Sequence, residues 1–186
     1  MKRAFDLSLA TIGLVCLGLP MAIVALLVKV TSQGPVFYWS DRIGKNNTIF
    51  AMPKFRTMKK GTPPVPTHLF QEAGQFMTPL GKLLRKLSID ELPQLLSIMR
   101  GDMSFVGPRP ALFNQDDLKA LRTEKGIHTL VPGLTGWAQI NGRDELPIPV
   151  KVEFDEYYLK HQSFMFDLKI LILTLVKVLR SEGVKA

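Results

Sequence analysis

The chain has 186 residues, of which 46% are hydrophobic, and a formal net charge of +8. This length accommodates one domain or one domain with an appendage, and the single cysteine, Cys16, excludes an intramolecular disulfide and a cysteine-based metal site. The basic charge suits nucleic acid, anionic lipid head groups or a phosphorylated substrate, and charge alone does not separate these partners.

An apolar segment near the N-terminus, residues 5–28, is long enough to cross a bilayer, which takes about 20 residues. Basic residues stand at both of its ends, Lys2 before it and Lys29 after it. Basic residues favour the cytoplasmic side of a membrane, so this preference is met at both ends only if both ends of the segment lie on the cytoplasmic side. Pro20 removes a helix hydrogen bond and predicts a kink. We therefore expect residues 1–30 to form a membrane-inserted re-entrant helix.

Three other interpretations of this segment stay open. A straight membrane-spanning helix fits its length as well as a re-entrant helix does. A secretory signal peptide has the same basic start, but no small-residue cleavage site follows and Asp6 interrupts the apolar run. A buried core helix is disfavoured by the length of the segment.

Two short apolar runs, residues 36–39 and 48–52, flank a polar turn and predict a small β-hairpin. Just beyond the second run, Lys54 and Arg56 are two residues apart in an extended segment. Side chains at this spacing point to the same face of a strand, so we expect both cations on one side of the chain.

A short basic helix is predicted next. Thr78 followed by Pro79 is typical of a helix start, because proline is well placed at the first helical position. The helix bears Lys82, Arg85 and Lys86, which are spaced to share one face.

An acidic pair, Asp90 and Glu91, follows these cations. Ser88 and Glu91 have the spacing of a capping box, which predicts a helix with both carboxylates in its first turn. Pro93 fits this helix only if it starts a residue or two later. The positive end of a helix favours ionised carboxylates, and these suit attack on phosphorus or binding of a hard divalent cation.

Two later segments carry candidate substrate-binding groups. Arg109 stands between two prolines, which hold it extended, as a guanidinium that meets a phosphate would need to be held. A solvated arginine in a rigid connector is an equal alternative. Residues 131–143 form a long mixed loop with turn dipeptides, a tryptophan, two amides and an arginine, which is typical of a functional loop.

The C-terminal segment, residues 164–180, alternates apolar and cationic positions. Lys169, Lys177 and Arg180 fall on one side of a helix, opposite a broad apolar face. We expect either an interfacial amphipathic helix whose lysines reach lipid head groups, or a helix packed on the protein core. We therefore expect an α+β, mainly helical fold, in which residues 31–186 form one domain at the cytosolic face, continuous with the re-entrant helix.

Four motifs in register, residues 54–58, 87–95, 101–110 and 132–143, closely resemble those of the bacterial sugar transferases. More narrowly, the chain resembles the small monotopic polyprenyl-phosphate phosphoglycosyl transferases that start lipid-linked glycan assembly. The likeness covers nearly the whole chain. One departure is Leu19 before Pro20, where the family has a serine whose hydroxyl could satisfy backbone groups freed by the kink.

The resemblance implies transfer of a sugar 1-phosphate from a UDP-sugar to polyprenyl (undecaprenyl) phosphate, with release of UMP. It implies that Asp90 is the nucleophile that forms a covalent phosphosugar intermediate, and that Glu91 is a ligand of Mg²⁺. The remaining candidates for binding phosphate or substrate lie in the four motifs or just before them: Lys54, Arg56, Arg85, Arg109, Gln139, Asn141 and Arg143.

The expected location is the cytoplasmic face of the bacterial inner membrane, in contact with lipid and without a nucleic-acid partner. A homodimer is possible, and the donor sugar stays open. Two alternatives to the transferase remain. One is a non-catalytic basic membrane adaptor that binds anionic lipid or a partner protein; the other is a membrane phosphatase or nucleotide-sugar hydrolase with the same aspartyl chemistry.

Overall fold

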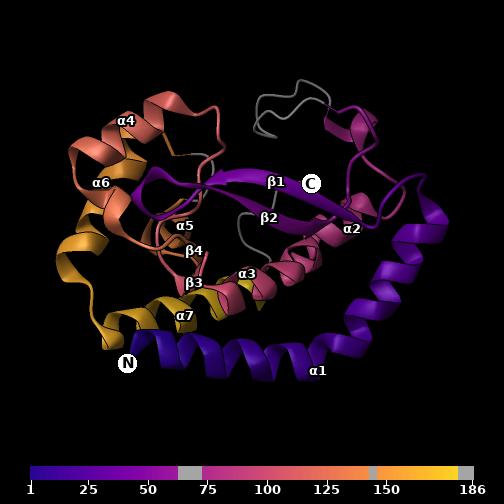
Figure 1. Ribbon diagram of the computed structural model, residues 1–186, viewed down its shortest axis with the longest axis horizontal. Helices are drawn as coiled ribbons and strands as arrows, with labels where there is room; N and C mark the ends of the chain where they lie inside the picture. The colour runs from indigo at the N-terminus through magenta and orange to yellow at the C-terminus, as the bar shows by residue number, and fades with distance from the viewer. Residues whose placement is uncertain (63–72, 143–145, 180–186) are drawn as a thin grey trace.

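The computed structural model describes residues 1–62, 73–142 and 146–179. Within these ranges the chain is mainly helical, with two small two-stranded sheets (Figure 1). The α-helices are α1 (Lys2–Thr31), α2 (Gly81–Lys86), α3 (Leu95–Arg100), α4 (Asp116–Glu124), α5 (Trp137–Asn141), α6 (Ile148–His161) and α7 (Phe164–Leu179). The strands are β1 (Phe37–Ile43), β2 (Ile49–Phe55), β3 (Ser104–Val106) and β4 (Gly133–Thr135). The 3₁₀ turns are η1 (Lys45–Asn47), η3 (Ala73–Phe76), η4 (Ile89–Gln94) and η5 (Ile127–Thr129).

Helix α1 is sharply bent, so that it wraps around the rest of the molecule in two arms (Figure 1). Pro20 lies inside this helix and leaves one of its backbone carbonyls without the usual intrahelical donor. The first arm packs Ala10 against Leu95 of α3, and the second packs Val28 against Phe55 of β2. The predicted kink is confirmed. The helix is also long and apolar enough to cross a bilayer, and most of its side chains are exposed, which fits membrane association.

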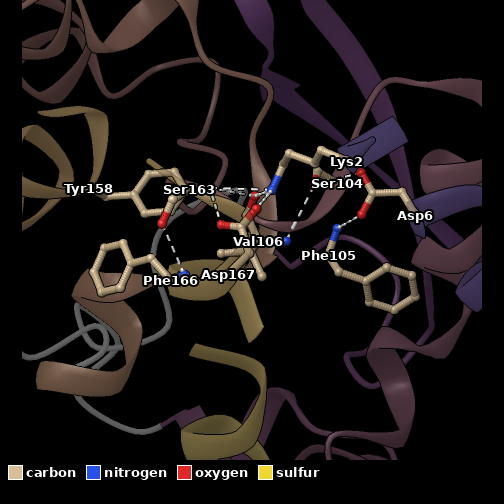
Figure 2. Close-up of polar contacts among 9 residues, drawn as sticks. All are labelled: Lys2, Asp6, Ser104, Phe105, Val106, Tyr158, Ser163, Phe166 and Asp167. Atoms are coloured by element: carbon tan, nitrogen blue, oxygen red, sulfur yellow. Dashed lines mark hydrogen bonds and ion pairs between the residues drawn. The ribbon is translucent and has the colours of Figure 1, made fainter. Parts of the chain in front are cut away.

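A buried polar cluster holds the start of α1 against α7 and β3 (Figure 2). Lys2 Nζ lies 2.6 Å from Asp167 Oδ2, and the Tyr158 hydroxyl donates to Asp167 Oδ1 at 2.6 Å. Asp6, which interrupts the apolar run, accepts hydrogen bonds from the Ser104 hydroxyl at 2.9 Å and the Phe105 amide at 3.2 Å. The polar residues of this segment therefore have structural partners, and they tie the first arm of α1 to the domain that carries the site.

Helix α7 packs on the protein with Asp167 and Ile170 buried, and it leaves other apolar side chains exposed. Lys177 donates to the Ile140 carbonyl at 2.5 Å, and the Lys169 ammonium lies 5.8 Å from the Trp137 ring centroid. Several apolar side chains are exposed, with Met165 73% and Leu175 63% exposed, and Lys169 is exposed as well. Lys177 therefore bonds to the protein, while Lys169 is exposed beside an aromatic face. Contact of these lysines with lipid head groups stays a prediction. Arg180 lies outside the described residues.

The predicted hairpin is confirmed, since β1 and β2 pair antiparallel with Phe37 opposite Phe55 and Ile43 opposite Ile49. The second sheet, in which β3 pairs parallel with β4, was not predicted. Its strands lie close because of glycines: a Cβ on Gly133 would stand 2.1 Å from the Gly107 amide nitrogen. This close approach places the Pro108–Pro110 connector against the loop that precedes α5.

Candidate active site

The acidic pair lies on the 3₁₀ turn η4, which leads directly into α3. Both carboxylates are in its first turn, as predicted, but the capping box is not formed. Ser88 has a left-handed backbone (φ 55°) and makes no side-chain cap hydrogen bond, and the α-helix begins only at Leu95. Pro93 lacks the N–H that a regular helix would need at this point, which explains the tighter turn and the late start.

Glu91 gathers two cations from distant parts of the chain. Lys54 Nζ donates to Glu91 Oε1 at 2.8 Å, and Arg109 Nη2 donates to the same oxygen at 3.0 Å. Burial acts to raise the pKa of Glu91, but the two cations outweigh it and lower this pKa well below its usual range. Glu91 is therefore held ionised. The rigid Arg109 predicted between two prolines does meet an anionic group.

Asp90 is buried, with 7% of its surface exposed, and lies within the field of Lys54, Glu91 and Arg85. Burial raises the pKa of Asp90, and the nearby Lys54 opposes this rise without cancelling it. In contrast to Glu91, its carboxylate accepts no hydrogen bond from any residue that the structure describes. Its oxygens thus accept no hydrogen bond within the described part of the chain, and this is the state expected of an attacking group.

Two more predicted cations, Arg85 and Arg56, bond to other described residues than the acidic pair. Arg85 donates from Nε to the Thr57 hydroxyl at 2.9 Å, which anchors α2 beside the acidic pair. Arg56 is buried and donates to the Ser32 hydroxyl at 2.9 Å, at the end of α1. Lys54 and Arg56 therefore have different partners, Glu91 for Lys54 and the end of α1 for Arg56.

The amides of the long loop bond to their own segment. Gln139 Nε2 donates to the Leu134 carbonyl at 3.3 Å, and Asn141 Nδ2 donates to the Trp137 carbonyl at 2.8 Å. No hydrogen bond joins either amide to Asp90 or Glu91 in the part of the chain that the structure describes. Arg143, the third candidate of this loop, lies outside the described residues.

One residue that the sequence analysis missed, Arg122, bonds to the backbone of Arg109 and so helps to fix the position of this arginine. Arg122 Nη1 donates to the Arg109 carbonyl at 2.8 Å, and its Nη2 lies 2.6 Å from Asp155 Oδ2. Arg122 and Asp155 are both buried, and they join α4 to α6 beneath the proline-flanked connector. The only signal in the sequence is a lone arginine in a helix, which is ordinarily a solvated residue.

Replacing Asp155 with asparagine should destabilise the protein by about 3 kcal/mol, because it leaves the Arg122 charge buried without its partner. A denaturant titration measures the effect. Lys125 and Glu156 make a matched control, since they also join α4 to α6, at 2.7 Å, but at the surface. Glu156→Gln should leave the stability nearly unchanged, because an exposed ion pair is screened by solvent. Equal losses in the two variants would contradict a special role for the buried pair.

Residues 1–181 match the family described as bacterial sugar transferase. The four motifs of the sequence, and the acidic pair among cations that the fold assembles, lie within this match. The chain belongs to the bacterial sugar transferase family. It is therefore a transferase, and membership of this family of enzymes disfavours the non-catalytic adaptor.

Among relatives of this sugar transferase, an uncharacterized sugar transferase, EpsL, of Bacillus subtilis (strain 168) is 44% identical over all of this chain and 90% of its own length. The exopolysaccharide production protein ExoY of Sinorhizobium fredii is 37% identical over 98% of this chain and 87% of its own. A UDP-glucose:undecaprenyl-phosphate glucose-1-phosphate transferase of Escherichia coli is 38% identical over 95% of this chain, which spans only 40% of that longer protein.

Proposed function

We propose that this enzyme transfers a sugar 1-phosphate from a UDP-sugar to polyprenyl phosphate and releases UMP, by way of a covalent intermediate on Asp90. The observation that carries this proposal is a buried carboxylate with no hydrogen bond from the described residues, placed next to a second carboxylate that is paired with two cations. Relatives named as undecaprenyl-phosphate sugar phosphotransferases support the transfer to a lipid phosphate.

Two displacements at one phosphorus account for the reaction. An oxygen of the Asp90 carboxylate attacks the β-phosphorus of the UDP-sugar; the bond from that phosphorus to the bridging oxygen breaks, and UMP leaves with this oxygen. An oxygen of polyprenyl phosphate then attacks the same phosphorus, the bond to Asp90 breaks, and the carboxylate is restored. A covalent intermediate lets one site serve a soluble and a lipidic anion in turn.

The cations around the pair make this attack possible. A carboxylate and a diphosphate repel each other, and preorganised positive groups in a site shielded from water reduce that repulsion most effectively. Lys54 and Arg109 are held in place by Glu91, and Arg85 by Thr57. We expect these three side chains to contact the phosphate oxygens of the donor.

Glu91 fits the role of a Mg²⁺ ligand in its chemistry. It is an ionised carboxylate, and both of its hydrogen bonds from described residues go to Oε1, so that Oε2 is not engaged by them. The described residues contain no cluster of three or more acidic, histidine or cysteine side chains, and Mg²⁺ at a single carboxylate relies on substrate phosphates for further ligands. When bound, Mg²⁺ would neutralise charge on the diphosphate. EDTA should then stop turnover, and Mg²⁺ should restore it.

The test is intact-protein mass spectrometry on enzyme that is given donor without acceptor and quenched rapidly. A mass increase equal to one phosphosugar is expected, together with one equivalent of UMP, and undecaprenyl phosphate should then discharge the adduct. Absence of the adduct at all quench times would refute the covalent route. Continuous UMP release without acceptor would instead favour the nucleotide-sugar hydrolase.

The rate should depend on pH through two groups of the site. Asp90 attacks only when ionised, and because burial raises its pKa, activity should fall at a higher pH on acidification than for an exposed aspartate. Burial lowers the pKa of Lys54, so its positive charge should be lost earlier than that of an ordinary lysine as pH rises. Lys54→Arg should remove the alkaline limb of kcat/KM, since arginine stays charged. An unchanged alkaline limb would exclude Lys54 as its source.

Relatives of similar identity are named for N-acetylgalactosamine, glucose and galactose. A screen of UDP-sugars against undecaprenyl phosphate, with UMP as readout, would identify the donor. We propose that the enzyme lies on the cytoplasmic face of the bacterial inner membrane. Helix α1 would enter the cytoplasmic leaflet, bend and return to the same side. A homodimer is compatible with this placement.

A further inference from the structure

Helix α2 and its C-terminal cap residue, Leu87, carry an exposed apolar stripe beside an exposed cationic stripe. Leu83 and Leu87 are 52% and 51% exposed and stand one turn apart, and Lys82 and Lys86 form an exposed cationic stripe beside them. The next residue, Leu84, is buried against Val28 and Phe55 and anchors the helix to the fold. The exposed leucines thus do not belong to the core. We call Lys82, Leu83, Lys86 and Leu87 the α2 surface.

The α2 surface connects directly to the reaction centre. Arg85, on the same helix, is bonded to Thr57 and acts on the charge of Asp90, and the chain passes from Leu87 through Ser88 and Ile89 to Asp90. Helix α2 lies on the inner side of the bend in α1 (Figure 1). Leu84 packs α2 on the second arm of α1, and η4, which carries the acidic pair, follows α2 in the chain, so a molecule seated on the α2 surface would lie near both.

We propose that the α2 surface binds the polyprenyl-phosphate acceptor, with the isoprenoid chain on Leu83 and Leu87 and the phosphate guided by Lys82 and Lys86 toward Asp90. This rests on the proposed function and assigns the acceptor a place in the same site. The acceptor is an amphiphile with one phosphate at the end of an apolar chain. A lysine stripe next to a leucine stripe matches it in both charge and polarity.

The test removes each stripe separately and measures the acceptor by itself. Undecaprenyl phosphate is titrated in neutral detergent micelles without donor, and its Kd is measured by native mass spectrometry, so the result does not depend on turnover. Lys82→Gln/Lys86→Gln should weaken binding about tenfold, since each exposed charge contact is worth only a few-fold. The matched control, Lys45→Gln/Lys160→Gln, removes two exposed cations elsewhere and should change Kd less than twofold.

The leucine stripe has its own control in α7, where Ile172 and Leu175 are 61% and 63% exposed. Leu83→Ser/Leu87→Ser should weaken acceptor binding, whereas Ile172→Ser/Leu175→Ser should leave it unchanged. If the two double variants weaken acceptor binding equally, the acceptor contacts exposed apolar side chains in general and not the α2 surface. That result would overturn the proposal. An unchanged Kd in the Lys82/Lys86 variant would overturn it too.

Turnover separates this proposal from the covalent mechanism. In the Lys82/Lys86 variant, adduct formation from UDP-sugar alone and the KM for UDP-sugar should stay at wild-type values, while the KM for undecaprenyl phosphate rises about tenfold. If wild-type enzyme forms no adduct but the Kd still rises in the variant, the covalent route fails and the acceptor site stands. A parallel rise in both KM values would show a distorted site rather than a lost acceptor contact.

Discussion

Replacing Asp90 with asparagine should lower kcat at least about ten-thousandfold, as expected when the nucleophile of a covalent mechanism is removed. The fold should survive the change. The Asp90 carboxylate accepts no hydrogen bond from the described residues, and burial already disfavours its charge. A neutral amide of the same shape therefore loses no bond and relieves a desolvation penalty.

The measurement pairs steady-state UMP release with thermal unfolding of the same preparation. Asp90→Asn should unfold at the wild-type temperature or above it, and should give no mass adduct with UDP-sugar. Asp41→Asn, an exposed aspartate of β1, is the control and should keep wild-type activity. Substantial activity in Asp90→Asn would remove this residue from the role of nucleophile.

Replacing Glu91 with glutamine should lower kcat/KM on the order of a hundredfold or more, because it removes the charge that orients Lys54 and Arg109. Both cations donate to one oxygen, so a single substitution weakens two contacts at once. The loss of negative charge beside Asp90 also removes one of the causes that raise the Asp90 pKa. The acidic limb of the pH profile should therefore shift to lower pH.

Glu156→Gln is the matched control for this variant. Glu156 also accepts from two cations, Lys125 at 2.7 Å and Lys160 at 2.6 Å, but these pairs are at the surface. Its loss should change kcat/KM less than twofold. If the Mg²⁺ concentration needed for half-maximal activity does not rise in Glu91→Gln, the residue orients cations but does not bind the metal.

The helical content, the hairpin and the acidic pair could be predicted because each depends on local pattern. Apolar runs, turn residues and the order of motifs are properties of neighbouring residues. The prediction of the capping box failed at one position. The spacing of Ser88 and Glu91 favoured an ordinary helix start, but Pro93 and the left-handed Ser88 tighten the turn to 3₁₀ geometry. The capping-box spacing favours an α-helix start at this point, but Pro93 cannot donate the hydrogen bond that a regular helix needs there.

Side-chain direction on α7 could not be predicted from its pattern. The amphipathic period separates a lysine side from an apolar side but does not say which side faces the protein. In the structure Lys177 donates to a carbonyl of α5, whereas Lys169 is exposed with its ammonium near the Trp137 ring. The same limit applies to Lys54 and Arg56, which the strand pattern placed together but which bond to Glu91 and to Ser32 respectively.

By itself the sequence determined the chemical inventory of this transferase: a bent apolar helix, an acidic pair, the cations around it and their order along the chain. Only the tertiary structure decided which cations meet which carboxylate. Lys54 and Arg109 reach Glu91 from positions 37 and 18 residues away, and Arg122 reaches Asp155 across 33. Such pairings are set by how helices and strands pack, and packing is a property of the whole chain that no local period encodes.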